Sequence, residues 1–163
     1  MVAIFCSYSG KDASWIKSYR DLLTAAGHST YLFQDDQQPG RYIAEKIQSE
    51  INKADVVLAF ITQHSTGSDY VQQEIGYALK AGKPIIPLVE EGVRSLGMLE
   101  GREYLPFHRN KDPEQMTPEG CNALMRYLYQ LNIEKLLKDA LIGILLLALC
   151  IGVAYYVTKH GYS

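Results

Sequence analysis

Three short polar segments follow apolar stretches of this sequence, and their hydroxyl, carboxylate and amide side chains could contact a ligand. They are residues 7–10 (Ser-Tyr-Ser-Gly), 34–36 (Gln-Asp-Asp) and 62–65 (Thr-Gln-His-Ser). If the apolar stretches are parallel strands of one sheet, these segments follow the carboxyl ends of the strands. Open α/β sheets bind ligands in the crevice at that edge. The sequence therefore predicts that the three segments line one binding site.

Several chemistries are excluded by the residues in these segments. A response-regulator receiver needs acidic residues after its first strand and an aspartate after its third, whereas this chain has Ser7, Tyr8 and Thr62 there. No G-x-x-x-x-G-K-[ST] or G-x-G-x-x-G phosphate loop is present. The three cysteines are far apart and the four histidines lack metal-ligand spacing, so we expect no metal site. A net charge of −2 argues against a nucleic-acid partner.

The elements that must position these segments alternate between apolar runs and helical periodicities. Apolar runs predict strands at residues 2–6, 30–33, 56–61, 84–89 and 104–107. Helical spacing predicts helices that begin after Ser9, near Ile43 and at Asp69, with Asp12 at the capping-box spacing from Ser9. Apolar strands that alternate with helices are typical of a parallel sheet covered on both faces. The predicted fold is α/β, with a flavodoxin-like, doubly wound, five-stranded parallel sheet.

Segments of this chain resemble, in order and spacing, the motifs of the TIR (Toll/interleukin-1 receptor-like) domain family. Residues 4–9 (Ile-Phe-Cys-Ser-Tyr-Ser) resemble its first box, and residues 36–40 (Asp-Gln-Gln-Pro-Gly) resemble the D-x-x-P-G of its BB loop. Residues 54–61 are similar to its third strand, residues 68–78 to its S-x-W-x-x-x-E helix and residues 82–88 to the strand that follows. The resemblance implies the TIR fold for this part of the chain.

The resemblance also implies an enzyme that cleaves NAD+ at the nicotinamide glycosidic bond, with Glu74 as its catalytic carboxylate. Cleavage builds positive charge on the ribose, which a carboxylate can stabilise, and nicotinamide leaves as a neutral group without a general acid. NAD+ is then a substrate, and no cofactor is implied. The residues predicted to contact the substrate are Tyr8, Ser9, Phe33, Asp36 and Tyr70. Tyr70 stands where the family more often has tryptophan.

In the family, the BB loop mediates contacts between TIR domains, and Asp36, Pro39 and Gly40 are its residues here. Proline fixes φ and glycine permits a left-handed turn, so this pair suits a tight loop. Simpler interpretations remain for three of the site residues. Glu74 could lie on a solvated helix face, Phe33 could pack in the core, and Asp36 could be solvated or cap the amides of its turn.

The composition changes near Lys138, after a helix predicted at about 117–131 that completes a TIR domain over residues 1–134. Residues 140–157 carry no charge, and as a helix they would extend about 27 Å, close to the thickness of a hydrocarbon core. The sequence therefore predicts a juxtamembrane linker at 135–139, a transmembrane helix at 140–157 and a short tail at 158–163. A slight excess of basic residues before the span predicts a single-pass, tail-anchored protein with a cytoplasmic TIR domain.

The favoured hypothesis is a membrane-anchored NAD+ glycohydrolase or ADP-ribosyl cyclase, activated by self-assembly and similar to prokaryotic immune TIR proteins. Its expected partners are NAD+, further copies of the chain, the lipid bilayer, and other TIR or effector proteins. The alternative is a non-catalytic adaptor that recruits TIR proteins through the BB loop. A third hypothesis is an effector whose tail oligomerises and permeabilises the membrane.

Overall fold

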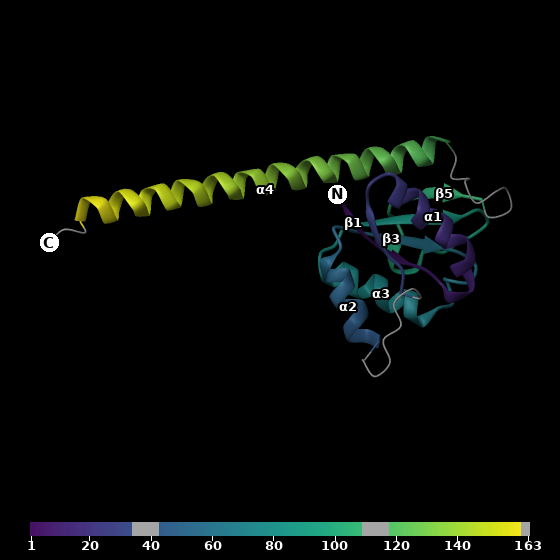
Figure 1. Cartoon of the computed structure of the whole chain (residues 1–163). Coiled ribbons are helices and arrows are strands. Elements are labelled where there is room, and N and C mark those ends of the chain that lie inside the picture. The colour runs from purple at the N-terminus through teal and green to yellow at the C-terminus, as the bar shows by residue number, and fades with distance from the viewer. Residues whose placement is uncertain (34–42, 109–117, 161–163) are drawn as a thin grey trace. The chain divides into compact units, whose positions relative to one another are not determined.

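Strands and helices follow one another in the order that the sequence predicts, as the computed structural model of the protein shows (Figure 1). The structure describes residues 1–33, 43–108 and 118–160, without the side chains of residues 118–119 and 152–160. The elements are β1 (Ala3–Ser7), η1 (Gly10–Asp12), α1 (Ala13–Ala25), β2 (Ser29–Tyr31), α2 (Ile43–Lys53), β3 (Val56–Ile61), α3 (Asp69–Lys80), β4 (Ile85–Glu90), η3 (Gly97–Leu99), β5 (Leu105–Phe107) and α4 (Pro118–His160). The chain divides into two compact units, residues 1–126 and 127–163.

The five described strands form one parallel sheet in the order β2-β1-β3-β4-β5, which confirms the predicted α/β fold. The chain first moves outward from β1 to β2 and then returns past β1 to β3, so the winding reverses between β1 and β3. In this central pair, Ser7 lies opposite Ala59. The carboxyl ends of β1 and β3 therefore mark the switch point, where open sheets bind ligands.

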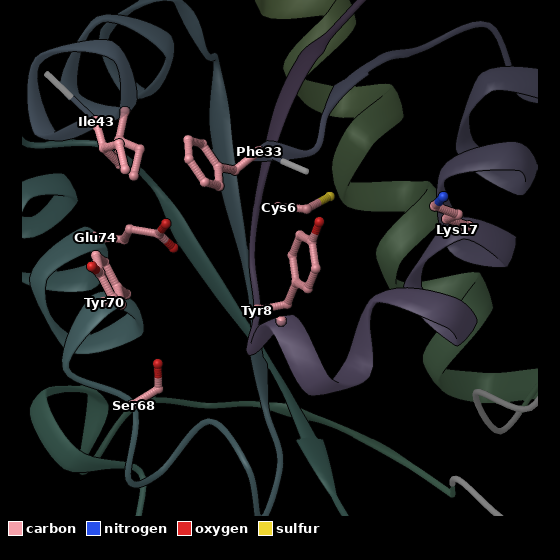
Figure 2. A pocket seen from close by; sticks show the side chains of 10 residues that line it. Cys6, Tyr8, Lys17, Phe33, Ile43, Ser68, Tyr70 and Glu74 are labelled. Carbon is pink, nitrogen blue, oxygen red and sulfur yellow. The ribbon is translucent and has the colours of Figure 1, made fainter. Parts of the chain in front are cut away.

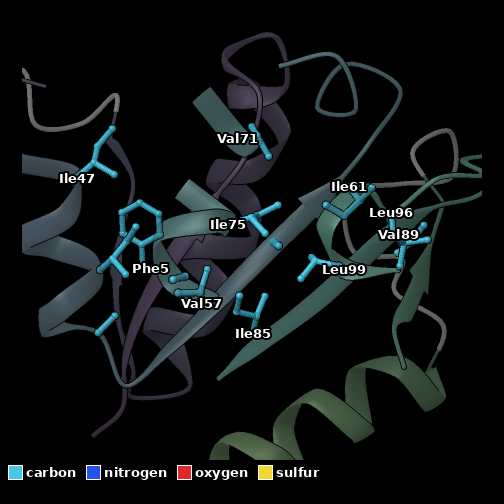
Figure 3. Packing of buried hydrophobic residues seen from close by; sticks show 14 residues of the cluster. Phe5, Ile47, Val57, Ile61, Val71, Ile75, Ile85, Val89, Leu96 and Leu99 are labelled. Atoms are coloured by element: carbon cyan, nitrogen blue, oxygen red, sulfur yellow. The ribbon is translucent and has the colours of Figure 1, made fainter. Parts of the chain in front are cut away.

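Alternation along β3 divides its side chains between the two faces of the sheet. Val57, Ala59 and Ile61 belong to the buried cluster that packs against α2 and α3, together with Phe5 of β1 (Figure 3). All four of these side chains are at most 1% exposed, so this face excludes water. Burying a side chain as large as Val57, Ile61 or Phe5 contributes roughly 2 kcal/mol to folding.

On the opposite face, four aromatic rings hold α1 against the sheet. Trp15 and Tyr19 come from successive turns of α1, and they meet Phe60 of β3 and Phe107 of β5. The six ring pairs have centroids 5.0–6.5 Å apart. Such edge-to-face and tilted pairs add about 1 kcal/mol each to the burial of their area. The result is a rigid attachment for the helix that follows the first polar segment.

Two prolines lie inside strands without removing a ladder hydrogen bond. The Val57 N–H donates to the Pro84 carbonyl (2.9 Å), so the backbone groups of Pro84 point toward β3. Successive residues of a strand point to alternate sides, and the nitrogen of Pro87, three residues later, therefore points toward β5. There the pairing of β4 with β5 begins only at Leu88. The middle residue of β5 is Pro106, and the Phe107 carbonyl beside it accepts from Glu91 N–H at 2.9 Å on the inner side. The Pro106 nitrogen therefore lies on the outer edge of the described sheet.

One helix, α4, replaces the separate helix, linker and span that the sequence predicts after residue 117. Residues 135–139, predicted as a linker, are helical because they contain no glycine or proline and are rich in good helix formers. The change of hydropathy near Lys138 alters the kind of surface that the helix presents, and it leaves the backbone conformation unchanged.

No helix among the described residues is both long enough and apolar enough to cross a membrane. The transmembrane helix predicted at 140–157 is therefore not supported by the structure. The side chains of residues 152–157 in that prediction, and the backbone of residues 161–163 in the predicted tail, lie outside the described residues. In the described part of α4, large apolar side chains between Leu141 and Ile151 are exposed.

Candidate functional site

A cavity of about 500 Å³ lies at the carboxyl end of β1, beside the switch point of the sheet (Figure 2). Four predicted site residues line it, namely Tyr8, Phe33, Tyr70 and Glu74. They come from the segment after β1, the segment after β2, and α3. The topology of the sheet thus brings together residues that lie far apart in the sequence.

Glu74 lies within the buried face of α3. Val71, Ile75 and Ala78 mark that face at helical spacing, and all three are fully buried. Glu74 is only 7% exposed, whereas its neighbour Gln73 is exposed. The interpretation of Glu74 as part of a solvated helix face is therefore wrong. A carboxylate on this face must find its partners inside the protein.

The partner of Glu74 is Ser7, the last residue of β1. The Ser7 hydroxyl donates a hydrogen bond to Glu74 Oε2 at 2.5 Å, and Ser7 is completely buried. Ser7 is absent from the predicted site residues. The alternation of β1 could have found it, since Phe5 faces α2 and α3, and Ser7 lies two residues further along the same face.

Burial controls the ionisation of the acidic groups around this cavity. Desolvation raises the pKa of Glu74 to about 7, while the hydrogen bond from Ser7 acts in the opposite direction. Burial, with a smaller contribution from the charge of Glu74, raises the pKa of Cys6 to about 12. The Cys6 thiol is thus protonated at neutral pH, which argues against a nucleophilic role. Glu74 can hold or release a proton near neutrality.

The remaining predicted residues fall in different places. Phe33 packs against the core cluster, as the simpler interpretation has it, and it also lines the cavity, so its contact with the substrate stays a prediction. Tyr70 is 65% exposed at the rim. Ser9 is buried and does not line the cavity, and its carbonyl accepts from Asp12 N–H at 2.8 Å. The predictions for Asp36, Pro39 and Gly40 lie outside the described residues.

Asp12 joins the segments that follow β1 and β3, instead of capping α1 with Ser9 as the spacing predicts. Its Oδ2 accepts from the Thr62 hydroxyl at 2.7 Å, and both residues are fully buried. The Thr62 Oγ1 in turn accepts from the N–H groups of His64 (3.1 Å) and Ser65 (3.0 Å). This network fixes two of the three predicted polar segments relative to each other.

A second cavity of about 240 Å³ shares Tyr70 and Glu74 with the first and extends along α3 to Tyr77. The Tyr77 hydroxyl accepts from Asn52 Nδ2 at 2.8 Å. Glu74 therefore lies where the two cavities meet. Among the residues that the structure covers, no group of three or more His, Cys, Asp and Glu side chains could hold a metal ion.

Comparisons with known proteins agree with this architecture. The sequence model of a family described as TIR domain matches residues 4–120. The TIR domain of the Toll-related receptor TRR-2 from Hydra magnipapillata is similar in structure, with a TM-score of 0.64 and 18% identity over 80% of this chain and 97% of that chain. The CMP N-glycosidase BcmB of Clostridium botulinum gives a TM-score of 0.50 and 21% identity, over 67% of this chain and 90% of that chain.

The TIR domains of the activated Roq1 resistosome give a TM-score of 0.51 and 14% identity, over 56% of this chain and 58% of that chain. These structural similarities concern the fold alone, because the identities are low. A search of curated protein sequences gives no match.

Proposed function

This chain belongs to the TIR domain family, and on that premise we propose that it is an NAD+ glycohydrolase or ADP-ribosyl cyclase. The observation that carries the proposal is the position of Glu74, which is buried in the wall of a cavity of about 500 Å³ and accepts a hydrogen bond from Ser7. A carboxylate in such a site interacts with charge more strongly than one in water. BcmB, which has a similar fold, is named as a CMP N-glycosidase, and such an enzyme also cleaves an N-glycosidic bond.

The proposed reaction breaks the bond between ribose C1′ and the pyridine nitrogen of nicotinamide. The bonding electron pair passes to the nitrogen, so the pyridinium ring leaves as neutral nicotinamide and positive charge develops on the ribose. The Glu74 carboxylate stabilises that charge. In hydrolysis, a water oxygen bonds to C1′ and its proton passes to Glu74 or to solvent. In cyclisation, a nitrogen of the adenine takes the place of water.

Aromatic side chains near Glu74 suit the flat leaving group. Phe33 and Tyr70 line the cavity together with Tyr8, and Figure 2 shows Tyr70 beside Glu74 while the ring of Phe33 lies between Glu74 and Cys6. Stacking on an aromatic face is typically worth about 1 kcal/mol beyond the area that it buries. We propose that these rings bind the nicotinamide and hold C1′ beside the carboxylate.

The proposed enzyme reaction is tested by incubating the full chain with NAD+ at high protein density. We expect loss of NAD+ with release of an equal amount of nicotinamide, and chromatography identifies the other product as ADP-ribose or a cyclic isomer. A high protein density is used because we propose that assembly of the TIR domains activates the enzyme. An assembled protein that leaves NAD+ intact would contradict the proposal. It would favour the adaptor hypothesis, in which Pro39→His abolishes binding to other TIR proteins.

We also propose that the apolar part of α4 attaches the chain to a lipid bilayer, with the TIR domain on the cytoplasmic side. Its support is the set of exposed leucine and isoleucine side chains between Leu141 and Ile151. The full chain is expected to float with phospholipid vesicles in a density gradient. The double variant Leu145→Arg, Leu149→Arg should stay at the bottom, while Tyr129→Arg, an exposed position earlier in α4, should float. Equal flotation of all three proteins with the vesicles would contradict the proposal.

A further inference from the structure

The cavity that contains Glu74 continues past the end of β1 to Lys17 on α1. Figure 2 shows these two residues on opposite sides of Cys6 and Tyr8, which belong to β1 and the segment after it. In the described wall of the cavity, Glu74 is the acidic residue and Lys17 the basic one. The site therefore carries opposite charges toward its two ends.

This arrangement matches a ligand whose two ends also differ in charge. In a phosphorylated ribosyl compound, positive charge develops at C1′ during cleavage, while the phosphate on the 5′ oxygen is negative. We propose that Lys17 binds the phosphate of a phosphorylated N-glycoside while Glu74 stands beside C1′, an assignment that rests on the proposed function of Glu74. Lys17 then selects nucleotides over unphosphorylated ribosides.

The properties of Lys17 suit this role. A lysine ammonium is a compact charge on a flexible stem, and it commonly binds phosphate as a point charge. Lys17 is exposed, so it can meet a phosphate that keeps part of its hydration. The net charge of the chain is −2, so the molecule as a whole does not attract anions. A local cation is therefore needed at the end of the cavity that receives the phosphate.

The test compares two substrates that differ in phosphorylation, NAD+ and nicotinamide riboside, with the full chain and two variants. Lys17→Met removes the charge and keeps a long side chain of high helix propensity. It is expected to raise KM for NAD+ about tenfold, with kcat and the KM for the riboside unchanged. The matched control is Lys11→Met, an exposed lysine in η1 that does not line the cavity, which should leave both KM values unchanged.

Calorimetric binding in a Glu74→Gln background separates the two proposals, since it requires no turnover. Adding Lys17→Met to that background should weaken NAD+ binding about tenfold and leave riboside binding unchanged. If the wild type fails to cleave NAD+ but this selectivity holds, the proposed reaction is wrong and the phosphate site stands. An equal effect on both ligands, or an unchanged affinity for NAD+, would overturn the assignment of Lys17.

Discussion

Replacing Glu74 by glutamine is expected to lower kcat for NAD+ cleavage by about 10³-fold or more, while the domain stays folded. Glutamine preserves the size of the side chain and can still accept the hydrogen bond from Ser7. It carries no negative charge, so it cannot stabilise the positive charge on the ribose. Release of nicotinamide by the full-length variant, measured by chromatography at pH 8, checks this expectation.

The activity of the wild type should also depend on the ionisation of Glu74. Burial raises the pKa of this carboxyl to about 7, so its charged form becomes the major one only above neutral pH. The value of kcat/KM for NAD+ is therefore expected to rise with pH through an apparent pKa near 7. A profile that is flat between pH 5 and 9 would contradict the assignment of Glu74.

The same substitution should stabilise the fold at alkaline pH. In the unfolded chain, the carboxyl returns to its ordinary pKa of 4.5, so between 4.5 and about 7 the folded protein holds the proton more tightly than the unfolded chain. The free energy of unfolding therefore falls as the pH rises across that interval. Above it, the buried charge lowers stability by on the order of 3 kcal/mol. Glutamine avoids this loss.

Thermal melts at two pH values measure this effect. Glu74→Gln should melt several degrees above the wild type at pH 8, and the difference should vanish below pH 4.5. The matched control is Glu103→Gln, an exposed carboxylate outside both cavities that contain Glu74, for which neither activity nor stability should change appreciably. A destabilised Glu74→Gln protein at pH 8 would show that the charge of Glu74 is compensated inside the fold.

Replacing Ser7 by alanine is expected to lower kcat/KM at pH 7 by roughly 10- to 100-fold, which is the range for a hydrogen bond to a charged group. The hydroxyl favours the ionised carboxylate, so its loss should move the rise of the pH profile to higher pH. At a pH where Glu74 is fully ionised, part of the loss should remain, because the carboxylate is then held less firmly beside C1′.

The pH profile distinguishes this positioning role from a merely structural one. Ser7→Thr keeps the hydroxyl and suits a strand, so it should restore the position of the profile. Ser14→Ala, on the exposed side of α1, serves as the control that leaves activity unchanged. If Ser7→Ala lowers stability but leaves the apparent pKa where it is in the wild type, Ser7 only packs against Glu74.

The local pattern of apolar residues predicts most of the sheet, because buried strands are more hydrophobic than the segments around them. The predicted strand at 56–61 coincides with β3, and the other predictions differ at their ends by one or two residues. Ser7 shows why the ends differ. Its polar side chain interrupts the apolar run, so the hydropathy pattern predicts that the strand ends before it. Its backbone nevertheless pairs with Ala59 in the parallel ladder, and this pairing extends β1 to residue 7.

Contacts between distant segments are less accessible from the sequence. Asp12 has the spacing of a helix cap, but its carboxylate meets Thr62, which lies 50 residues away, and a 3-10 turn precedes α1. The contact of Ser7 with Glu74 spans 67 residues. The burial of Glu74 was within reach, since the residue lies three positions after Val71 on the apolar face of α3. The alternation of β1 likewise places Ser7 on the face that packs against α3, but the sequence does not show that its hydroxyl meets Glu74.

Pro106 has a consequence for how copies of this domain can associate. It lies at the middle of β5, which has three residues, and it offers no N–H on the outer edge of the described sheet. A second chain that approached this edge as an additional strand would find a donor missing at the centre of the new ladder. Association that continues the hydrogen bonding from copy to copy, as in amyloid, is thus blocked at this edge. Copies that meet at this edge must instead join through side-chain surfaces, and such contacts can separate again.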